Sequence, residues 1–173
     1  MNGPAFRNHD GCDKMKAVIQ RVLNSSVTVD GITVGAIEYG YTVLLCVVNG
    51  DSEKEADLLA GKIARLRIFC DEQGKMNLSI ADVGGSALVI SQFTLCADTK
   101  KGNRPSFTDS AEPLEANRLY EYFAGKLSEC GISNVQKGIF AADMKVYILN
   151  DGPVTIILDT DSWQKSGLKT INR

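Results

Sequence analysis

Two short segments carry more polar groups than their surroundings require, and they are the first candidates for chemistry. Ser91–Leu95, with the sequence SQFTL, follows the apolar stretch Ala87–Ile90, and Asn150–Thr155 contains the dipeptide Gly152-Pro153. A strand end with hydroxyl groups and a turn built from turn-forming residues would also explain these segments.

The folded part of the chain has no histidine, the residue that most often transfers protons in enzymes. Its single histidine, His9, lies in an N-terminal segment that we set apart from the folded domain. Ser-His-Asp and Cys-His mechanisms, His-ligated metals and a histidine base are therefore excluded from the folded body. Neither a GxxxxGK[ST] phosphate loop nor a GxGxxG dinucleotide motif occurs. If the protein is an enzyme, backbone groups, a carboxylate or the substrate itself must supply the catalysis. We expect no cofactor and no metal.

The composition is that of a soluble globular domain. The 173 residues are 44% hydrophobic and 23% charged, which suits one domain with its own core. No apolar run reaches the roughly 20 residues that span a membrane, and the N-terminus has no apolar segment of a secretory signal. We therefore expect a cytoplasmic protein that does not bind membranes.

The five cysteines are expected to be free. They are odd in number, widely spaced and without a CxxC pair, so neither a disulfide framework nor a zinc site is indicated. Cysteines within apolar stretches behave as small hydrophobic residues. This cysteine usage predicts a reducing compartment.

The overall charge does not indicate nucleic-acid binding. The formal net charge is −2, from 19 Lys and Arg against 21 Asp and Glu. A protein that holds only one end of an RNA needs just a local basic patch, and Lys100, Lys101 and Arg104 form one. A solvated loop explains the same charges, and charge alone favours that interpretation.

Alternating and apolar stretches separated by turns predict a strand-rich α/β domain. Strands are expected at Lys16–Val22, Ser26–Val29, Ile32–Ile37, Tyr41–Val48, Arg67–Cys70, Ala87–Leu95, Val135–Phe140, Met144–Leu149 and Val154–Leu158. The Asp30-Gly31 pair predicts a hairpin turn. A capping box that begins at Ser52 predicts one helix, and Pro113 and Gly131 bracket a second.

These elements make one domain, residues 15–160. Residues 1–14 are interpreted as an N-terminal extension or a cloning remnant, with Met15 as the natural start. Residues 161–173 form a polar tail that is expected to fray, although Trp163 can dock on the domain.

The two polar segments resemble the motifs of the D-aminoacyl-tRNA deacylases, also called D-tyrosyl-tRNA deacylases. The similarity runs from Met15 to about Asp159, with the family's SQFTL motif at Ser91–Leu95 and its NxGPxT motif at Asn150–Thr155. Further similar segments are MKAVIQRV at 15–22, GKMNLS at 74–79, RPSFTD at 104–109 and ADM at 142–144. SQFTL alone is a weak signal, whereas both motifs in order and at matching spacing are specific.

The resemblance implies a homodimer with active sites at the subunit interface and a fold of two β layers or barrel-like sheets. It also implies a cis bond between Gly152 and Pro153, which an X-Pro amide tolerates. Two main-chain carbonyls of this loop would hold the substrate's α-amino group in the partner's pocket and exclude an L side chain. Arg21 aligns with a family arginine that locks the loop. Many D-amino acids, and glycine mischarged on tRNA-Ala, would then be released from tRNA.

For hydrolysis of the ester, buried backbone N–H groups near Phe93 and Thr94, in a site that excludes water, are the expected oxyanion donors. The resemblance implies that Ser91 and Gln92 position the substrate and the loop, and that Phe93 and Met144 pack beside the terminal adenosine. The nucleophile or assisting group is either the Thr94 hydroxyl or the 2′-hydroxyl of that adenosine. The absence of histidine favours the RNA-assisted reaction.

Two other functions stay open. A related editing enzyme that removes L-alanine from the wrong tRNA would have different pocket motifs and a trans Gly-Pro bond. A non-catalytic nucleic-acid-binding module would need a substantial basic extension, whereas residues 159–173 are few and of mixed charge. With tRNA as the partner, Lys100, Lys101 and Arg104 become candidate phosphate contacts.

Overall fold

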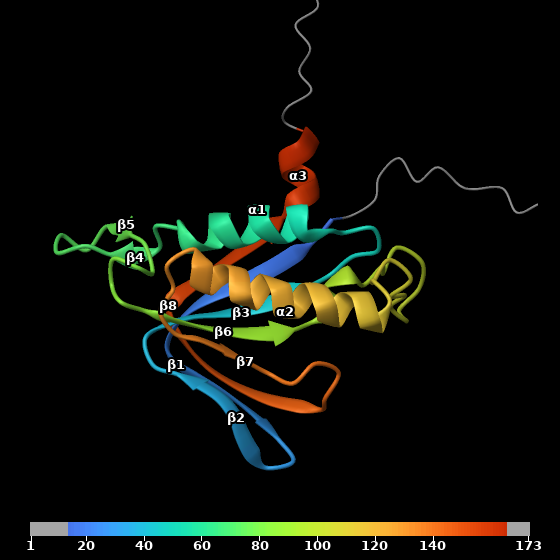
Figure 1. Cartoon of the computed structure of the whole chain (residues 1–173), viewed down its shortest axis with the longest axis horizontal. Coiled ribbons are helices and arrows are strands. Elements are labelled where there is room, and N and C mark those ends of the chain that lie inside the picture. The colour runs from blue at the N-terminus through green and yellow to red at the C-terminus, as the bar shows by residue number, and fades with distance from the viewer. Residues whose placement is uncertain (1–13, 166–173) are drawn as a thin grey trace, which may run out of the picture.

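One long strand, β1 (Lys16–Val29), organises the sheet in the computed structural model, which describes residues 14–165. Along one edge β1 pairs with β3 (Gly40–Cys46) and then with β2 (Ile32–Ile37). Its other edge pairs with β8 (Met144–Asp159) over nearly the whole length. Figure 1 shows β1 and β8 running side by side through the body of the molecule.

Two parallel pairings extend the sheet beyond β3. β6 (Ser86–Ser91) lies next to β3, and β7 (Val135–Lys137) lies next to β6. A separate hairpin of β4 (Phe69–Cys70) and β5 (Met76–Leu78) projects from the body (Figure 1). The strand-rich α/β prediction is confirmed.

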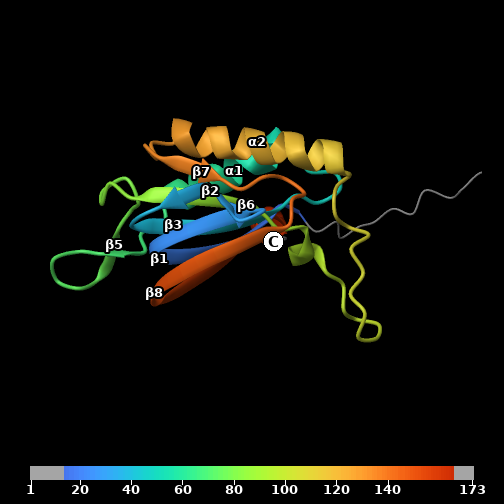
Figure 2. The same ribbon diagram turned by 90° about the horizontal axis from the view of Figure 1, so that it is seen from below.

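Two long helices cover one face of the sheet. α1 (Glu53–Ala64) begins with the predicted capping box, in which Ser52 accepts from backbone N–H and Glu55 accepts from the Ser52 N–H. α2 (Pro113–Glu129) begins at the predicted proline and is followed by Gly131 at φ +100°. Figure 2 shows both helices on the same side of the sheet. The two bracketed helices are thus confirmed.

The sheet separates two apolar cores. Side chains that point toward the helices, such as Ile19, Val43 and Val89, pack with α1 and α2. The alternate side chains, including Val27 and Leu88, pack inside the curled half of the sheet formed by β1, β2, β6 and β8. This curl makes the sheet nearly closed and barrel-like. The period of two along each strand assigns neighbouring residues to different cores.

Several predicted boundaries are wrong because pairing continues through polar residues. The sequence predicts two strands where β1 is a single one, and Ser25 inside it donates to the Tyr147 carbonyl of β8 at 2.7 Å. β7 ends at Lys137 because a turn at Ile139–Ala142 follows. The predicted Asp30-Gly31 turn is present, with φ of 50° and 78°.

The end of the described chain is a short helix. α3 (Thr160–Lys165) begins where the sequence predicts fraying, and Trp163 packs on the main core as expected. Residues 1–13 and 166–173 lie outside the described part, so the predicted N-terminal extension and most of the predicted tail lie outside it as well. Within residues 14–165 no helix is both long and apolar enough to cross a membrane.

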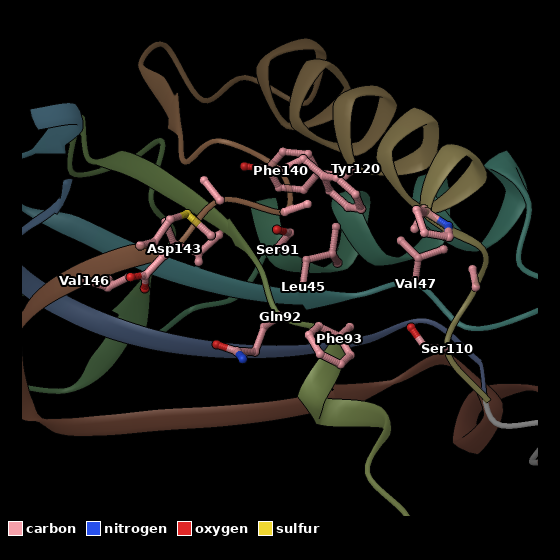
Figure 3. Close-up of a pocket in the computed structure, with 17 residues that line it drawn as sticks. Leu45, Val47, Ser91, Gln92, Phe93, Ser110, Tyr120, Phe140, Asp143 and Val146 are labelled. Atoms are coloured by element: carbon pink, nitrogen blue, oxygen red, sulfur yellow. The ribbon is translucent and has the colours of Figure 1, made fainter. Parts of the chain in front are cut away.

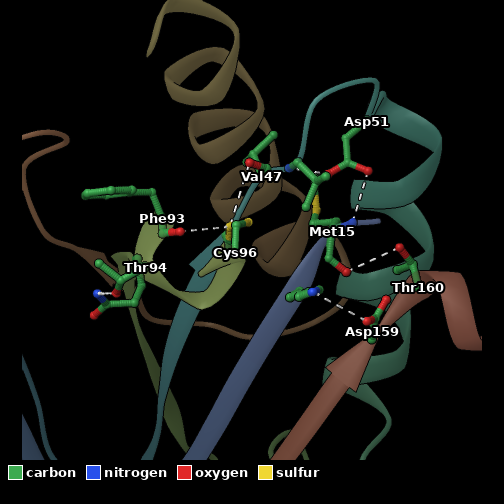
Figure 4. The surroundings of a disulfide bond; sticks show 12 residues. Met15, Val47, Asp51, Phe93, Thr94, Cys96, Asp159 and Thr160 are labelled. Carbon is green, nitrogen blue, oxygen red and sulfur yellow. Dashed lines mark hydrogen bonds and ion pairs between the residues drawn. A yellow bond between two sulfur atoms is a disulfide. The ribbon is translucent and has the colours of Figure 1, made fainter. Parts of the chain in front are cut away.

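A buried carboxylate ties the start of β1 to the loop after β3. Asp51 accepts hydrogen bonds from the N–H of Val48 at 2.7 Å and of Met15 at 3.0 Å (Figure 4). Burial raises the pKa of Asp51 to about 6, although both N–H groups favour the ionised form.

The expectation that all cysteines are free is wrong for one pair. Cys46, the last residue of β3, forms a disulfide with Cys96, which lies 50 positions later in the chain (Figure 4). Both residues are buried near the end of β3. The fold brings them together there, although their spacing in the sequence does not indicate that they pair. Among the described cysteines, Cys70 and Cys130 are free.

Opening this disulfide should lower the stability of the fold. Closing a loop of this length lowers the entropy of the unfolded chain by an amount worth about 4 kcal/mol, which corresponds to roughly 10 °C in Tm for a protein of this size. We therefore expect calorimetry of the oxidised protein to show a drop of that order on addition of dithiothreitol.

A Cys46→Ala/Cys96→Ala double variant is the matched control and should melt at one temperature in both conditions. A thiol titration of the denatured, unreduced wild type should find two fewer thiols than the reduced sample. Equal melting temperatures with full thiol reactivity would show that the pair does not close.

Candidate functional site

The SQFTL segment is a turn rather than the end of a strand, which corrects the predicted strand Ala87–Leu95. β6 ends at Ser91, and Phe93–Cys96 form a short 3-10 helix, η1. The N–H of Gln92 makes the last backbone hydrogen bond with β3, donating to the Leu45 carbonyl at 2.7 Å. Beyond Gln92 the backbone no longer pairs with β3. The Leu95 N–H instead donates to the Gln92 carbonyl at 3.2 Å, within the turn itself.

This turn presents polar groups and backbone N–H to the outside. The Gln92 amide donates to the Thr94 hydroxyl, and within residues 14–165 this is the hydroxyl's hydrogen-bond partner. An amide cannot take up the proton of an alcohol, so Thr94 has no activating base in the described chain. The first N–H groups of a helix have no acceptor inside it, which leaves those of Phe93 and Thr94 directed away from the turn.

The predicted dry environment of these N–H groups is absent from a single chain. Thr94 is exposed and the Phe93 side chain is 56% exposed. Two contacts nevertheless hold the turn in place: the Gln92–Leu45 hydrogen bond and the disulfide at Cys96. The turn is therefore anchored to β3 but open to solvent.

A pocket of about 530 Å³ opens beside the turn, at the end of β3 and β6 and below the start of α2 (Figure 3). This volume suits a small organic group. Four predicted residues line it: Ser91 and Gln92 supply polar groups at its border, and Phe93 and Met144 supply apolar surface. The other side chains that line it are Leu45, Val47, Ile90, Ser110, Ala111, Pro113, Ala116, Tyr120, Phe140, Ala141, Ala142, Asp143 and Val146.

Two aromatic side chains that sequence reasoning missed lie at the α2 side of the pocket. Tyr120 and Phe140 have ring centroids 6.0 Å apart, and the Tyr120 hydroxyl donates to the Val89 carbonyl at 2.8 Å. Burial raises the pKa of Tyr120 above its usual value, so the hydroxyl stays protonated. Tyr120 lies on the apolar stripe of α2, where the sequence pattern indicates core and nothing more.

The Gly152-Pro153 segment is a bulge in β8, not the predicted turn between two strands. Both flanks pair with β1, through Asn150 opposite Val22 and Thr155 opposite Gln20, and the register shifts between them. The Asn150 side chain closes the bulge, since its Oδ1 accepts from Val154 N–H at 3.0 Å. The Gly152-Pro153 peptide bond is cis, and Gly152 has φ +117°.

Arg21 lies directly under this bulge. Its side chain is buried and donates from Nη1 to the Ile68 carbonyl at 2.6 Å. Nε lies 2.9 Å from Asp151 Oδ2, a charged contact that is not aligned as a hydrogen bond, so the two groups form an ion pair. A Cβ on Gly152 would come within 2.9 Å of Arg21 Nη2. It would also come within 2.9 Å of Val154 Cγ2, and a side chain at φ +117° is strained, so this position favours glycine.

The bulge and the pocket do not meet within one chain. Arg21 pairs with Tyr41, and the pocket begins at Leu45, four residues further along β3. At about 3.3 Å per residue this separates them by roughly 13 Å along the sheet. Accordingly, neither Gly152 nor Pro153 lines the pocket.

The basic residues lie on a projecting loop next to η1. Backbone hydrogen bonds of 2.8 and 2.9 Å between Asp98 and Ser106 close the base of this loop. Lys100, Lys101 and Arg104 are all exposed on it. Within residues 14–165, no three His, Cys, Asp or Glu side chains are placed to hold a metal ion.

Comparison with known proteins matches this arrangement to one family. The sequence profile of the D-Tyr-tRNA(Tyr) deacylases matches residues 18–159. A D-aminoacyl-tRNA deacylase of Ruegeria pomeroyi is 60% identical over 145 residues, which cover 84% of this chain and 99% of the relative. A D-aminoacyl-tRNA deacylase of Geotalea uraniireducens is 59% identical, with 90% and 100% coverage.

Two solved structures share the fold. A c-Myc DNA unwinding element binding protein superposes with a TM-score of 0.78 at 41% identity, over 83% of this chain and 97% of that one. A probable eukaryotic D-amino acid tRNA deacylase gives a TM-score of 0.72 at 14% identity, over 84% and 98%, and supports the fold alone.

The profile match spans most of the domain and includes both the SQFTL turn and the Gly152-Pro153 bulge. The relatives at 59–60% identity are matched over essentially their whole length. The chain therefore belongs to the D-Tyr-tRNA(Tyr) deacylase family.

Proposed function

We propose that this protein hydrolyses the ester bond of D-aminoacyl-tRNA, releasing the D-amino acid and free tRNA. The observation that carries the proposal is the pocket bordered by Ser91, Gln92 and Phe93 in a chain of this family. It has the size of a nucleoside site and ends at a turn that presents backbone N–H groups. The enzyme needs no cofactor in this scheme.

The terminal adenosine of the tRNA occupies the pocket. Its largely apolar lining suits the faces of a purine base, and Phe140 and Met144 from the β7–β8 connection supply contact area. The 3′ ester then lies at the polar border, where Ser91 and Gln92 position it. The N–H groups of Phe93 and Thr94 stabilise the oxyanion as the ester carbonyl is attacked.

A second copy of the chain completes the site. The Gly152-Pro153 bulge is exposed and about 13 Å from the pocket of its own chain, so it serves the pocket of a partner. Exposed apolar side chains lie on β1 and β8, next to the bulge, at Leu23, Tyr147, Leu149 and Ile157. Exposed apolar groups of this number indicate an interaction surface. The same contact excludes water from the turn at Thr94.

The bulge selects for chirality through its main chain. Gly152 lets the backbone approach the substrate's α-carbon, because it carries no side chain. Carbonyl groups of the bulge hold the α-amino group, and an L side chain collides with the bulge while a D side chain points to solvent. Arg21 and its ion pair with Asp151 keep the bulge in this orientation. Achiral glycine passes the filter, so glycine mischarged on tRNA-Ala is also released.

The chemistry is assisted by the RNA. Thr94 has no base in the described chain, whereas the 2′-hydroxyl of the terminal adenosine lies next to the ester in every substrate. Exposed Lys100, Lys101 and Arg104 attract the phosphates of the tRNA end. The enzyme acts in the cytoplasm, where charged tRNA is found.

The solved relative with a DNA-related name favours one second candidate, a nucleic-acid-binding module without catalysis. A module of that kind would bind tRNA equally well with or without a D-aminoacyl group and would leave the ester intact. An editing enzyme for L-alanine would instead cleave the L ester. A deacylation assay on matched D-, L- and glycyl-tRNA distinguishes these functions.

Loss of the Arg21–Asp151 ion pair should weaken the chiral filter. Wild type should cleave D-tyrosyl- and glycyl-tRNA and leave L-alanyl-tRNA at its spontaneous rate. Arg21→Ala and Asp151→Asn each remove the pair, so the bulge can move and L-alanyl-tRNA hydrolysis should rise at least tenfold above wild type. Arg67→Ala, which removes an exposed arginine on the β4–β5 side, is the control.

Circular dichroism and thermal melting must show that the variants are folded, because Arg21 is buried. If Arg21→Ala does not fold, Asp151→Asn carries the test, because it removes the charge of Asp151 with almost no change of side-chain size and leaves buried Arg21 in place. Hydrolysis of L and D esters at similar rates by wild type would contradict the steric filter.

Removal of the Thr94 hydroxyl should matter less than removal of the substrate 2′-hydroxyl. Thr94→Ala keeps the backbone N–H and should retain kcat within about tenfold. A D-aminoacyl-tRNA that ends in 2′-deoxyadenosine should react at least 100-fold more slowly, in the range expected for loss of an assisting group. Single-turnover deacylation measures both. An inactive, folded Thr94→Ala protein would make the threonine the nucleophile.

Disruption of the β8 surface should abolish dimerisation and activity together. Ile157 is 75% exposed in one chain, so Ile157→Asp is tolerated by the monomer but places a charge in the interface. We expect analytical ultracentrifugation to show a monomer with at least tenfold lower deacylation. Ile32→Asp, at an equally exposed position of β2, is the control. A monomer with full activity would exclude a shared active site.

A further inference from the structure

Two aromatic side chains stand exposed at the border of the pocket. Phe93 and Phe107 have ring centroids 5.1 Å apart and planes inclined by 68°, an edge-to-face pair. Phe93 is more than half exposed and Phe107 is partly exposed. Apolar rings left in water at a binding site indicate a contact that covers them.

The pair leads outward from the pocket. Phe93 lines the pocket in Figure 3, whereas Phe107 does not belong to its wall. A ligand that fills the pocket and continues past Phe93 therefore meets Phe107 next. In the proposed reaction the continuing part is the single-stranded 3′ end of the tRNA.

The basic loop lies on the same segment. Ser106, which closes the base of the loop against Asp98, directly precedes Phe107. Lys100, Lys101 and Arg104 are exposed on the loop, and none of the three forms an ion pair within residues 14–165. Their charges are therefore available to an anionic chain that follows the aromatic pair.

Aromatic faces beside unpaired cations are the two components of sites for single-stranded nucleic acid. Bases stack on the rings irrespective of sequence, and phosphates contact the cations. We propose that Phe93 and Phe107 form a stacking platform for the nucleotide that precedes the terminal adenosine, with the basic loop along its phosphates. This proposal rests on the proposed function, which assigns the pocket to the terminal adenosine.

The platform can be tested with two small substrates that differ only in the nucleotides at issue. One is the 3′-D-tyrosyl ester of adenosine, and the other is the 3′-D-tyrosyl ester of the trinucleotide CCA. In wild type the trinucleotide should have the higher kcat/KM. Stacking of one base is worth about 1–3 kcal/mol, so Phe107→Ala should lower the trinucleotide-to-adenosine ratio of kcat/KM about tenfold, mainly through KM.

Variants of Phe107 separate stacking from packing. Phe107→Trp should keep the ratio near wild type because it retains an aromatic face, whereas Phe107→Leu should lower it as Phe107→Ala does. Ile32→Ala, which truncates an exposed apolar side chain on β2, should leave the ratio unchanged.

Three results would overturn the platform. Equal loss on both substrates would give Phe107 a structural role only. Full recovery by Phe107→Leu would mean that apolar area, and not stacking, is needed. A shift of the monomer–dimer equilibrium in Phe107→Ala, measured by analytical ultracentrifugation, would assign the rings to a second copy of the chain. If wild type cleaves neither ester nor D-tyrosyl-tRNA, it is the proposed function that fails.

Discussion

The pairing of β8 along β1 is the constraint on which the rest of the site depends. Because both flanks of residues 150–155 remain paired with β1, the extra residues have to bulge out of the sheet. Arg21 on β1 then lies beneath the bulge and pairs with Asp151. The other edge of β1 carries β3, whose far end forms the pocket. One strand thus fixes the positions of both halves of the site.

The proposed dimer would supply two features that one chain lacks. Backbone dipoles stabilise an oxyanion strongly only where water is excluded, and one chain leaves Thr94 exposed. A single chain also keeps its bulge about 13 Å from its pocket. In the proposed dimer, a partner covers the turn and inserts its own bulge into the pocket. Both deficits are then removed, and the apolar surface of β8 becomes part of the proposed site.

The SQFTL turn is held in place by two interactions of different chemistry. A backbone hydrogen bond from Gln92 joins it to Leu45, and the Cys46–Cys96 disulfide joins its other end to the same strand. Disulfides are rare in reducing compartments, where these two cysteines would lie as adjacent thiols. In that state the hydrogen bond from Gln92 to Leu45 still joins the turn to β3. The turn therefore depends on β3 more than on its own short helix.

Elements whose signals are local could be predicted from the amino-acid sequence. The capping box at Ser52, the Asp30-Gly31 turn and the proline at the start of α2 act over a few residues, so each could be predicted and each is present. The two motifs also identified the family and with it the candidate residues. These features depend only on neighbours along the chain.

Other features depend on which strand lies next to a segment, and they could be recognised only in the folded chain. Asn150–Pro153 has the composition of a turn, yet it is a bulge because β1 pairs on both sides of it. The SQFTL segment continues an apolar strand in sequence, yet it becomes a turn because β3 ends beside it. The Cys46–Cys96 bond and the roles of Tyr120 and Phe140 likewise follow from packing between distant segments. The pattern of residues along the chain does not show which distant segment will pack against it. The same side chains are compatible with a turn, a bulge or a core, and the neighbouring strand determines which of these forms.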